Sequence, residues 1–80
     1  MTVEEIQKRV FHVVCNQLQV SKDEVTLESK FVEDLGADSL DLTELAVGFE
    51  DEFLIEIPDS DFGKLSTVAG TITYLQTRLA

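Results

Sequence analysis

Residues 38–53, DSLDLTELAVGFEDEF, carry the clearest helical pattern in the chain. Their apolar members recur every three or four positions, so one side of a helix would face a core. Gly36 can adopt a positive φ, and Asp38 is a good N-cap. We therefore predict a helix from Ser39 to about Phe53, whose core side is formed by Leu42, Leu45, Ala46, Phe49 and Phe53.

Two further helices are predicted on either side of this one. Thr2 and Glu5 have the spacing of a capping box, and the apolar residues that follow predict a helix over Val3 to Leu18. Thr67 is a second capping residue, and Val68 begins a last helix that extends to about Leu79. The apolar positions of these two helices are Ile6, Val10, Val13, Val14, Leu18, Val68, Ile72, Leu75 and Leu79.

The connecting segments lack this periodicity. Residues 19–38 mix apolar and polar side chains and are predicted to form a long loop, while Pro58 ends any continuation of the central helix. Residues 59–61 suit a short helical turn at most. The sequence predicts one all-α domain over residues 1–80: a small four-helix bundle of three main helices and one short helix, with a long loop between the first and second helices.

Charge is distributed very unevenly. The chain has 16 acidic and 6 basic residues, and residues 31–63 hold eleven of the acids and no Lys or Arg. Such a segment repels phosphate backbones and anionic lipids, which argues against nucleic-acid and membrane partners. Basic protein surfaces are the expected partners.

Other composition features narrow the class of protein. No apolar run is long enough to span a membrane, and the first five residues are acidic where a secretion signal is basic. Cys15 and His12 are single, so neither an internal disulfide nor a Cys/His zinc site is expected. We expect Cys15 to pack beside Phe11 and Leu18, and we expect a reducing cytoplasmic compartment.

The side of the central helix away from its core stripe combines apolar and acidic residues. Scattered exposed hydrophobic residues are normal, but Leu40 and Val47 among acids also fit a docking face for a basic partner. We predict that the partner-binding residues are Asp38, Leu40, Asp41, Glu44, Val47, Glu50 and Asp51.

Ser39 lies in the first turn of the predicted helix. Free N–H groups and the helix dipole there favour a bound or attached phosphate, although serine is also a common capping residue. No catalytic base accompanies Ser39, since His12 belongs to another helix and no G-x-S-x-G turn is present. Any reaction at this hydroxyl must be carried out by another protein.

Residues 31–41, FVEDLGADSLD, resemble the signature of bacterial acyl carrier proteins of dissociated fatty-acid synthesis. The similarity continues through residues 44–45, 49–53, 56–59 and 64–68. It implies that Ser39 Oγ is joined by a phosphodiester to 4′-phosphopantetheine, which a separate transferase takes from coenzyme A. The arm would carry an acyl chain as a thioester, so the protein would be a carrier and not an enzyme.

The resemblance also implies a set of partners and a cavity for the acyl chain. The partners would be a phosphopantetheinyl transferase, acyltransferases, ketoacyl synthases, reductases and dehydratases with basic surfaces, served by a monomeric carrier. The cavity would lie between the second, short and last helices and be lined by Phe31, Leu45, Phe49, Ile57, Phe62, Leu65, Val68 and Ile72.

Five residues depart from the family's usual pattern: Thr43, Gly48, Phe49, Leu54 and Phe62. Phe49 and Phe62 are bulkier than the residues common there, which suggests a narrower cavity and a preference for shorter or unusual chains. Leu54 stands where a polar residue is typical. Thr43 stands where the helix usually has a hydrophobic residue, and Gly48 costs the helix about 1 kcal/mol relative to alanine.

Three alternatives remain at this point. A dedicated carrier for a polyketide, peptide or unusual lipid would share Ser39, whereas an acidic adaptor without a prosthetic group would not need it. A calcium-binding module fits poorly. An EF-hand loop starting at Asp34 or Asp59 would place Ser39 or Lys64 where glycine is required.

Overall fold

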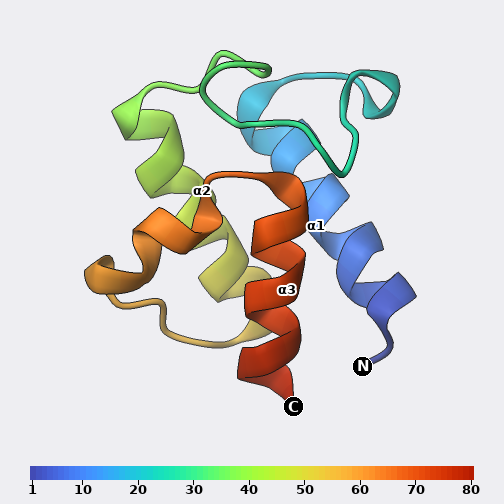
Figure 1. Ribbon diagram of the computed structural model, residues 1–80, viewed down its shortest axis with the longest axis vertical. Helices are drawn as coiled ribbons and strands as arrows, with labels where there is room; N and C mark the ends of the chain where they lie inside the picture. The colour runs from blue at the N-terminus through green and yellow to red at the C-terminus, as the bar shows by residue number, and fades with distance from the viewer.

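The structure is a computed structural model that describes all 80 residues, and it is helical with no strands (Figure 1). The predicted all-α bundle is confirmed. Two 3-10 segments accompany three α-helices, and the elements in chain order are α1 (Val3–Leu18), η1 (Lys22–Glu24), α2 (Ser39–Phe53), η2 (Asp59–Leu65) and α3 (Val68–Leu79). No helix is both long enough and apolar enough to cross a bilayer.

Local capping explains why the α-helices begin where the sequence predicts. The Thr2 hydroxyl accepts a hydrogen bond from the N–H of Glu5, and the Glu5 carboxylate accepts one from the N–H of Thr2. Thr67 caps α3 by accepting from the N–H of Gly70. These contacts satisfy N–H groups that the helix itself leaves free, so each start is determined within a few residues of sequence.

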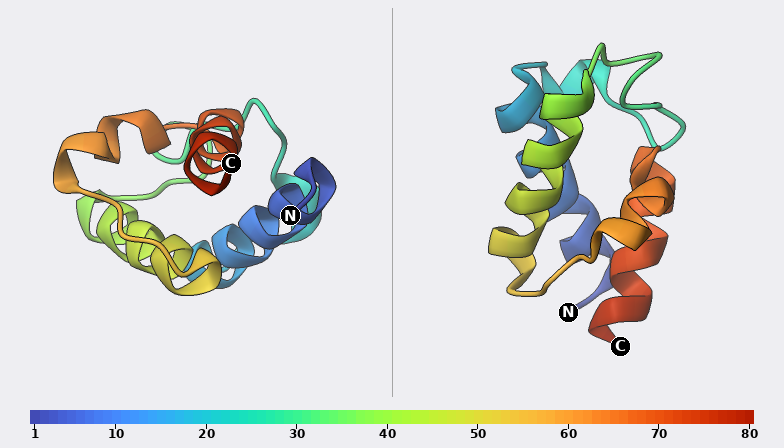
Figure 2. Two further views of the ribbon diagram at one scale, coloured as in Figure 1. Left: turned by 90° about the horizontal axis from the view of Figure 1, so that it is seen from below. Right: turned by 90° about the vertical axis from the view of Figure 1, so that its left-hand side faces the viewer.

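α3 runs along the long axis of the bundle, and α1 and α2 are inclined to it (Figure 2). Both termini lie at one end of the bundle, and the connection between α1 and α2 crosses the opposite end, where α2 also begins (Figures 1 and 2). α1 is antiparallel to both α2 and α3. η2 lies beside α3, on the side of the bundle where α2 lies. The first residue of α2 is therefore at the end of the bundle away from the termini.

One hydrophobic cluster joins the helices to the long loop. It combines the apolar stripes of α1, α2 and α3 with Val25, Phe31 and Ala37 of the loop and with Ile57 and Leu65 around η2. Cys15 is half-buried and packs with Phe11 and Leu18 against the edge of this cluster, as predicted.

The long loop is tied to the start of α3 by its backbone. The N–H of Val68 donates to the carbonyl of Ser29, and the N–H of Ala69 donates to the carbonyl of Leu27. Phe31 N–H donates in turn to the Ser66 carbonyl. These bonds satisfy the first donors of α3, and they explain how a loop of this length stays ordered.

The short helix is longer than the sequence indicated. The prediction was a turn over residues 59–61, but η2 continues through Gly63 to Leu65. Pro58 precedes η2, as expected. Leu65 is buried in the core, and the second half of η2 forms part of the wall of a cavity beside α2. Local sequence indicated the start of η2 but not this anchoring.

Candidate functional site

Ser39 is the first residue of α2 and is exposed to solvent. Its carbonyl accepts a hydrogen bond from the Thr43 hydroxyl at 3.1 Å, but its own hydroxyl has no hydrogen-bond partner in the chain. The hydroxyl is therefore free to react or to carry a substituent without breaking an existing contact.

Two aspartates build the start of α2 around this serine. Asp38 Oδ1 accepts from the N–H of Asp41 at 2.8 Å, and Asp41 Oδ2 accepts from the N–H of Asp38 at 3.1 Å. This reciprocal capping box begins the helix at Ser39. The positive end of the helix dipole offsets part of the charge of these carboxylates and of any phosphate attached nearby.

A cavity of about 370 Å³ opens beside Ser39. One wall comes from α2, the second from η2 and the residue after it, and the third from the loop before α2. Its lining residues are Lys30, Val32, Glu33, Ser39, Leu42, Thr43, Leu45, Ala46, Phe49, Phe62, Gly63, Leu65 and Ser66. A group attached to Ser39 would thus stand at the edge of a largely apolar space.

Only half of the residues that the sequence suggested for this cavity line it. Leu45, Phe49, Phe62 and Leu65 do so. The other four, Phe31, Ile57, Val68 and Ile72, are buried in the core and are absent from the cavity wall.

Sequence reasoning also missed several wall residues. Leu42, Thr43 and Ala46 lie one or two turns beyond Ser39, so helical spacing from the serine was a usable signal for them. For Lys30, Val32 and Glu33 no sequence signal existed, because their position depends on the pairing of the loop with α3.

The cavity wall formed by η2 is held to α3 by a polar network. The Tyr74 hydroxyl donates to Asp61 Oδ2 at 2.7 Å and accepts from Arg78 Nη1 at 2.6 Å. The hydrogen bond from Tyr74 holds the pKa of the Asp61 carboxyl below its usual value, and Lys64 lowers it further. Burial raises the pKa of Tyr74, and the bond to Asp61 adds to that rise.

Four residues of the proposed partner face, spread along α2, are exposed to solvent. Leu40 and Val47 are 66% and 50% exposed. Glu44 and Asp51 are also exposed and make no ion pair within the chain. All four residues are therefore accessible to a partner.

Three other residues suggested for this face have contacts of their own. Asp38 and Asp41 bond to each other's backbone in the capping box described above. Glu50 is half-buried, and its Oε2 accepts from the N–H of Ile57 at 2.7 Å. A partner that engaged Glu50 would compete with this bond or use the remaining carboxylate oxygen.

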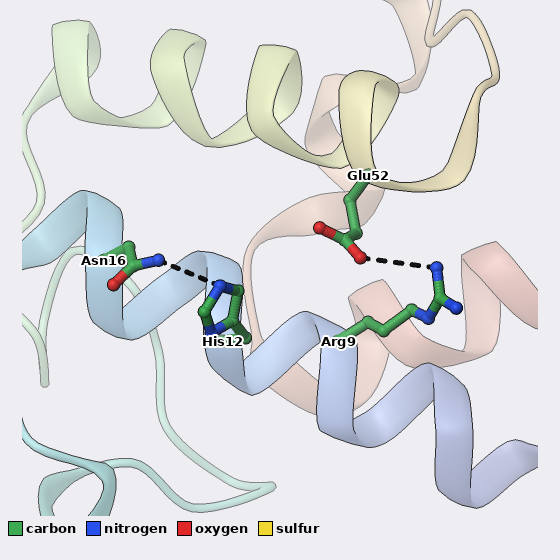
Figure 3. A network of polar contacts seen from close by, with 4 residues as sticks. All are labelled: Arg9, His12, Asn16 and Glu52. Carbon is green, nitrogen blue, oxygen red and sulfur yellow. Dashed lines mark hydrogen bonds and ion pairs between the residues drawn. The ribbon is translucent and has the colours of Figure 1, made fainter.

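The only histidine, His12, is exposed on α1, away from Ser39. His12 Nε2 is 3.1 Å from Asn16 Nδ2, and Arg9 pairs with Glu52 of α2 at 3.4 Å (Figure 3). His12 lines a different surface groove from the cavity at Ser39. The acids that suggested a calcium loop do not gather into a group that could hold a metal ion.

The comparisons with known proteins agree with this geometry. The family model described as "Phosphopantetheine attachment site" matches residues 8–75. A curated acyl carrier protein from Akkermansia muciniphila is 45% identical over 76 residues, which cover 95% of each chain. The chain belongs to the acyl carrier protein family.

As an acyl carrier protein, the chain is a carrier and not an enzyme, and its prosthetic group is 4′-phosphopantetheine. The residues at the start of α2 fit such a group. An exposed hydroxyl without a hydrogen-bond partner can form the ester bond to the phosphate of the arm, and the first turn of a helix favours the negative charge of that phosphate. Once attached, the group supplies a terminal thiol that carries the cargo as a thioester.

Proposed function

We propose that this protein carries the growing acyl chain of bacterial fatty-acid synthesis on a phosphopantetheine arm attached to Ser39, and that residues 1–80 act as one carrier domain. The observation that carries the proposal is the free, exposed hydroxyl at the first residue of α2, at the edge of an apolar cavity. The family match supports the chemistry.

Loading is carried out by a separate phosphopantetheinyl transferase. Ser39 Oγ attacks the phosphorus atom of coenzyme A that bears the pantetheine arm, and a phosphodiester forms as the diphosphate bond breaks. The adenosine bisphosphate leaves, and a base of the transferase takes the hydroxyl proton. Ser39 supplies only the nucleophilic oxygen.

Partner enzymes are expected to approach the exposed side of α2. Leu40 and Val47 offer apolar area, and Glu44 and Asp51 offer free carboxylates to a basic surface. The partners in this proposal are the transferase, acyltransferases, ketoacyl synthases, reductases and dehydratases. The carrier itself acts as a monomer in the cytoplasm.

The cavity is proposed to shelter the acyl chain while the carrier moves between enzymes. Its walls include Leu42, Leu45, Phe49 and Phe62, which are apolar, and it lies next to the attachment residue. The two phenyl rings limit its depth, so short chains are the expected cargo. A carrier dedicated to a specialised lipid or polyketide would share Ser39 and differ in the cargo found there.

Intact mass spectrometry tests the proposal. The protein is incubated with coenzyme A and a broad-specificity transferase, beside Ser39→Ala and the matched control Ser60→Ala, which changes an exposed serine in the first turn of η2. One phosphopantetheine should be added to the wild type and to Ser60→Ala, and none to Ser39→Ala. A wild type that stays unloaded, while the transferase loads a known carrier, would support the acidic-adaptor alternative.

A further inference from the structure

We propose that Lys30 binds the free carboxylate of a short acyl group that has a negative charge at its far end. The cavity beside Ser39 would then hold a second class of cargo, in which one carboxyl group of a dicarboxylic acid forms the thioester and the other stays ionised. The proposal rests on the carrier function above and extends it from apolar chains to anionic ones. It follows from the single cation in the wall of this cavity.

Lys30 is the only basic residue in a cavity wall that is otherwise largely apolar. It stands directly before residues 31–63, whose eleven acids are accompanied by no Lys or Arg. An anionic cargo attached to Ser39 is repelled by this acidic segment. Lys30 is therefore the one wall residue whose charge attracts such a cargo.

The ammonium group of Lys30 is available to a ligand. Its Nζ lies 3.6 Å from Glu33 Oε2, in an ion pair between side chains that are 59% and 66% exposed. This distance is too long for a hydrogen bond, and a pair with this exposure contributes little to stability. A carboxylate that reaches the ammonium group can therefore replace Glu33 as its partner at a small cost.

The backbone of Lys30 is held in place before any cargo arrives. Its N–H donates to Asp34 Oδ2 at 2.8 Å, and its carbonyl accepts from the N–H groups of Asp34 and Leu35. The residue also forms an isolated β-bridge with Thr67, the N-cap of α3. Because the backbone is ordered, only the Lys30 side chain loses freedom when it binds a carboxylate. None of these bonds uses the ammonium group, so the side chain can be changed without loosening the loop.

The cavity wall has a buried part and an exposed part, and an anionic chain fits the exposed part. Leu45, Phe49 and Leu65 are buried, whereas Val32, close to Lys30 in the loop, is 49% exposed. A carboxylate in the buried part would lose its hydration without gaining a partner. At the loop wall it keeps contact with water and meets Lys30. At about 370 Å³ the cavity is near the lower end of the range for ligand pockets, so the cargo is short.

Glutaryl and pentanoyl groups test the proposal, because both have five carbon atoms and only glutaryl ends in a carboxylate. Each group is transferred with its arm from the coenzyme A thioester to Ser39 by a broad-specificity transferase, and intact mass confirms the loading. The measurement is the rate at which hydroxylamine cleaves the thioester. A cargo held against the protein is cleaved more slowly than a free one.

Three variants separate binding of the carboxylate from other effects of charge. Lys30→Gln should raise the cleavage rate of the glutaryl protein about threefold, as expected for loss of a partly exposed ion pair, and leave that of the pentanoyl protein unchanged. Glu33→Gln removes the competing carboxylate and should lower the glutaryl rate. Lys64→Gln is the matched control and should change neither rate, because it removes the same charge from an exposed lysine of η2 that does not line the cavity.

Three outcomes would overturn the inference while leaving the carrier function intact, because loading by mass is checked first. One is an equal response of the two cargoes to Lys30→Gln, zero included, since Lys30 would then contact the arm, support the fold or do neither. Another is an effect of Lys64→Gln as large as that of Lys30→Gln. The third is a wild-type glutaryl protein cleaved as fast as free glutaryl-pantetheine. A wild type that cannot be loaded would instead remove the proposed function itself.

Discussion

Gly48 of α2 lies directly against Val13 of α1, and a Cβ atom at Gly48 would stand 2.9 Å from Val13 Cγ1. Val13 is buried between the two helices and, being β-branched, has essentially one rotamer available in a helix. The glycine therefore has a packing role. It costs the helix about 1 kcal/mol of propensity and allows α1 and α2 to approach closely.

Gly48→Ala is expected to lower the free energy of unfolding by about 1 kcal/mol, because strain against Val13 exceeds the gain in helix propensity. In a Val13→Ala background the same change should raise stability, since the opposing methyl group is gone. Urea unfolding of the four proteins measures both effects. A stabilising Gly48→Ala in the wild-type background would show that the contact relaxes without cost.

The link between Tyr74 and Asp61 should control the mobility of η2. Tyr74→Phe removes the hydroxyl that joins Asp61 to Arg78, so we expect Tm to fall by roughly 3–6 °C. Amide hydrogen exchange over residues 59–65 should become faster than elsewhere. Thr77→Val, which removes another hydroxyl from α3, is the matched control, and equal exchange in the two variants would contradict a role for the link.

Acid should weaken the same link. The pKa of Asp61 is lowered in the folded protein, mainly by the hydrogen bond from Tyr74. The stability that the ionised Asp61 carboxylate contributes is therefore present above about pH 4, and it is lost as the pH falls through the pKa of Asp61 in the folded protein. The difference in Tm between wild type and Tyr74→Phe should therefore shrink between pH 7 and pH 3. A difference that stays constant over this range would mean that Asp61 is not the partner that matters.

Phe62 is expected to limit the length of acyl chain that the cavity holds. Phe62→Ala should lower the free energy of unfolding of the unloaded protein by about 1–3 kcal/mol, because the ring is half-buried, and it should enlarge the cavity. Tm measured over a series of acyl-loaded proteins should then peak at a longer chain than in the wild type. An unchanged peak would place the cargo outside this cavity.

The sequence by itself determined the three α-helices and their first residues, but neither η1 nor the length of η2. Capping residues act on N–H groups three positions away, so Thr2, Asp38 and Thr67 could be identified without knowledge of the fold. Helical spacing likewise predicted that Leu40 and Val47 would be exposed. These features depend on contacts within one helix or on the spacing along one helix.

Only the tertiary structure decided the contacts between elements. Phe31 and Leu45 have the same apolar character in the sequence and are both buried in the core, yet only Leu45 also lines the cavity beside Ser39. Glu50 has the same charge as its acidic neighbours in the sequence, but only its carboxylate accepts a hydrogen bond from the N–H of Ile57. The physical reason is that such roles depend on which segment packs opposite a side chain, and that is determined by the packing of distant segments and not by local sequence.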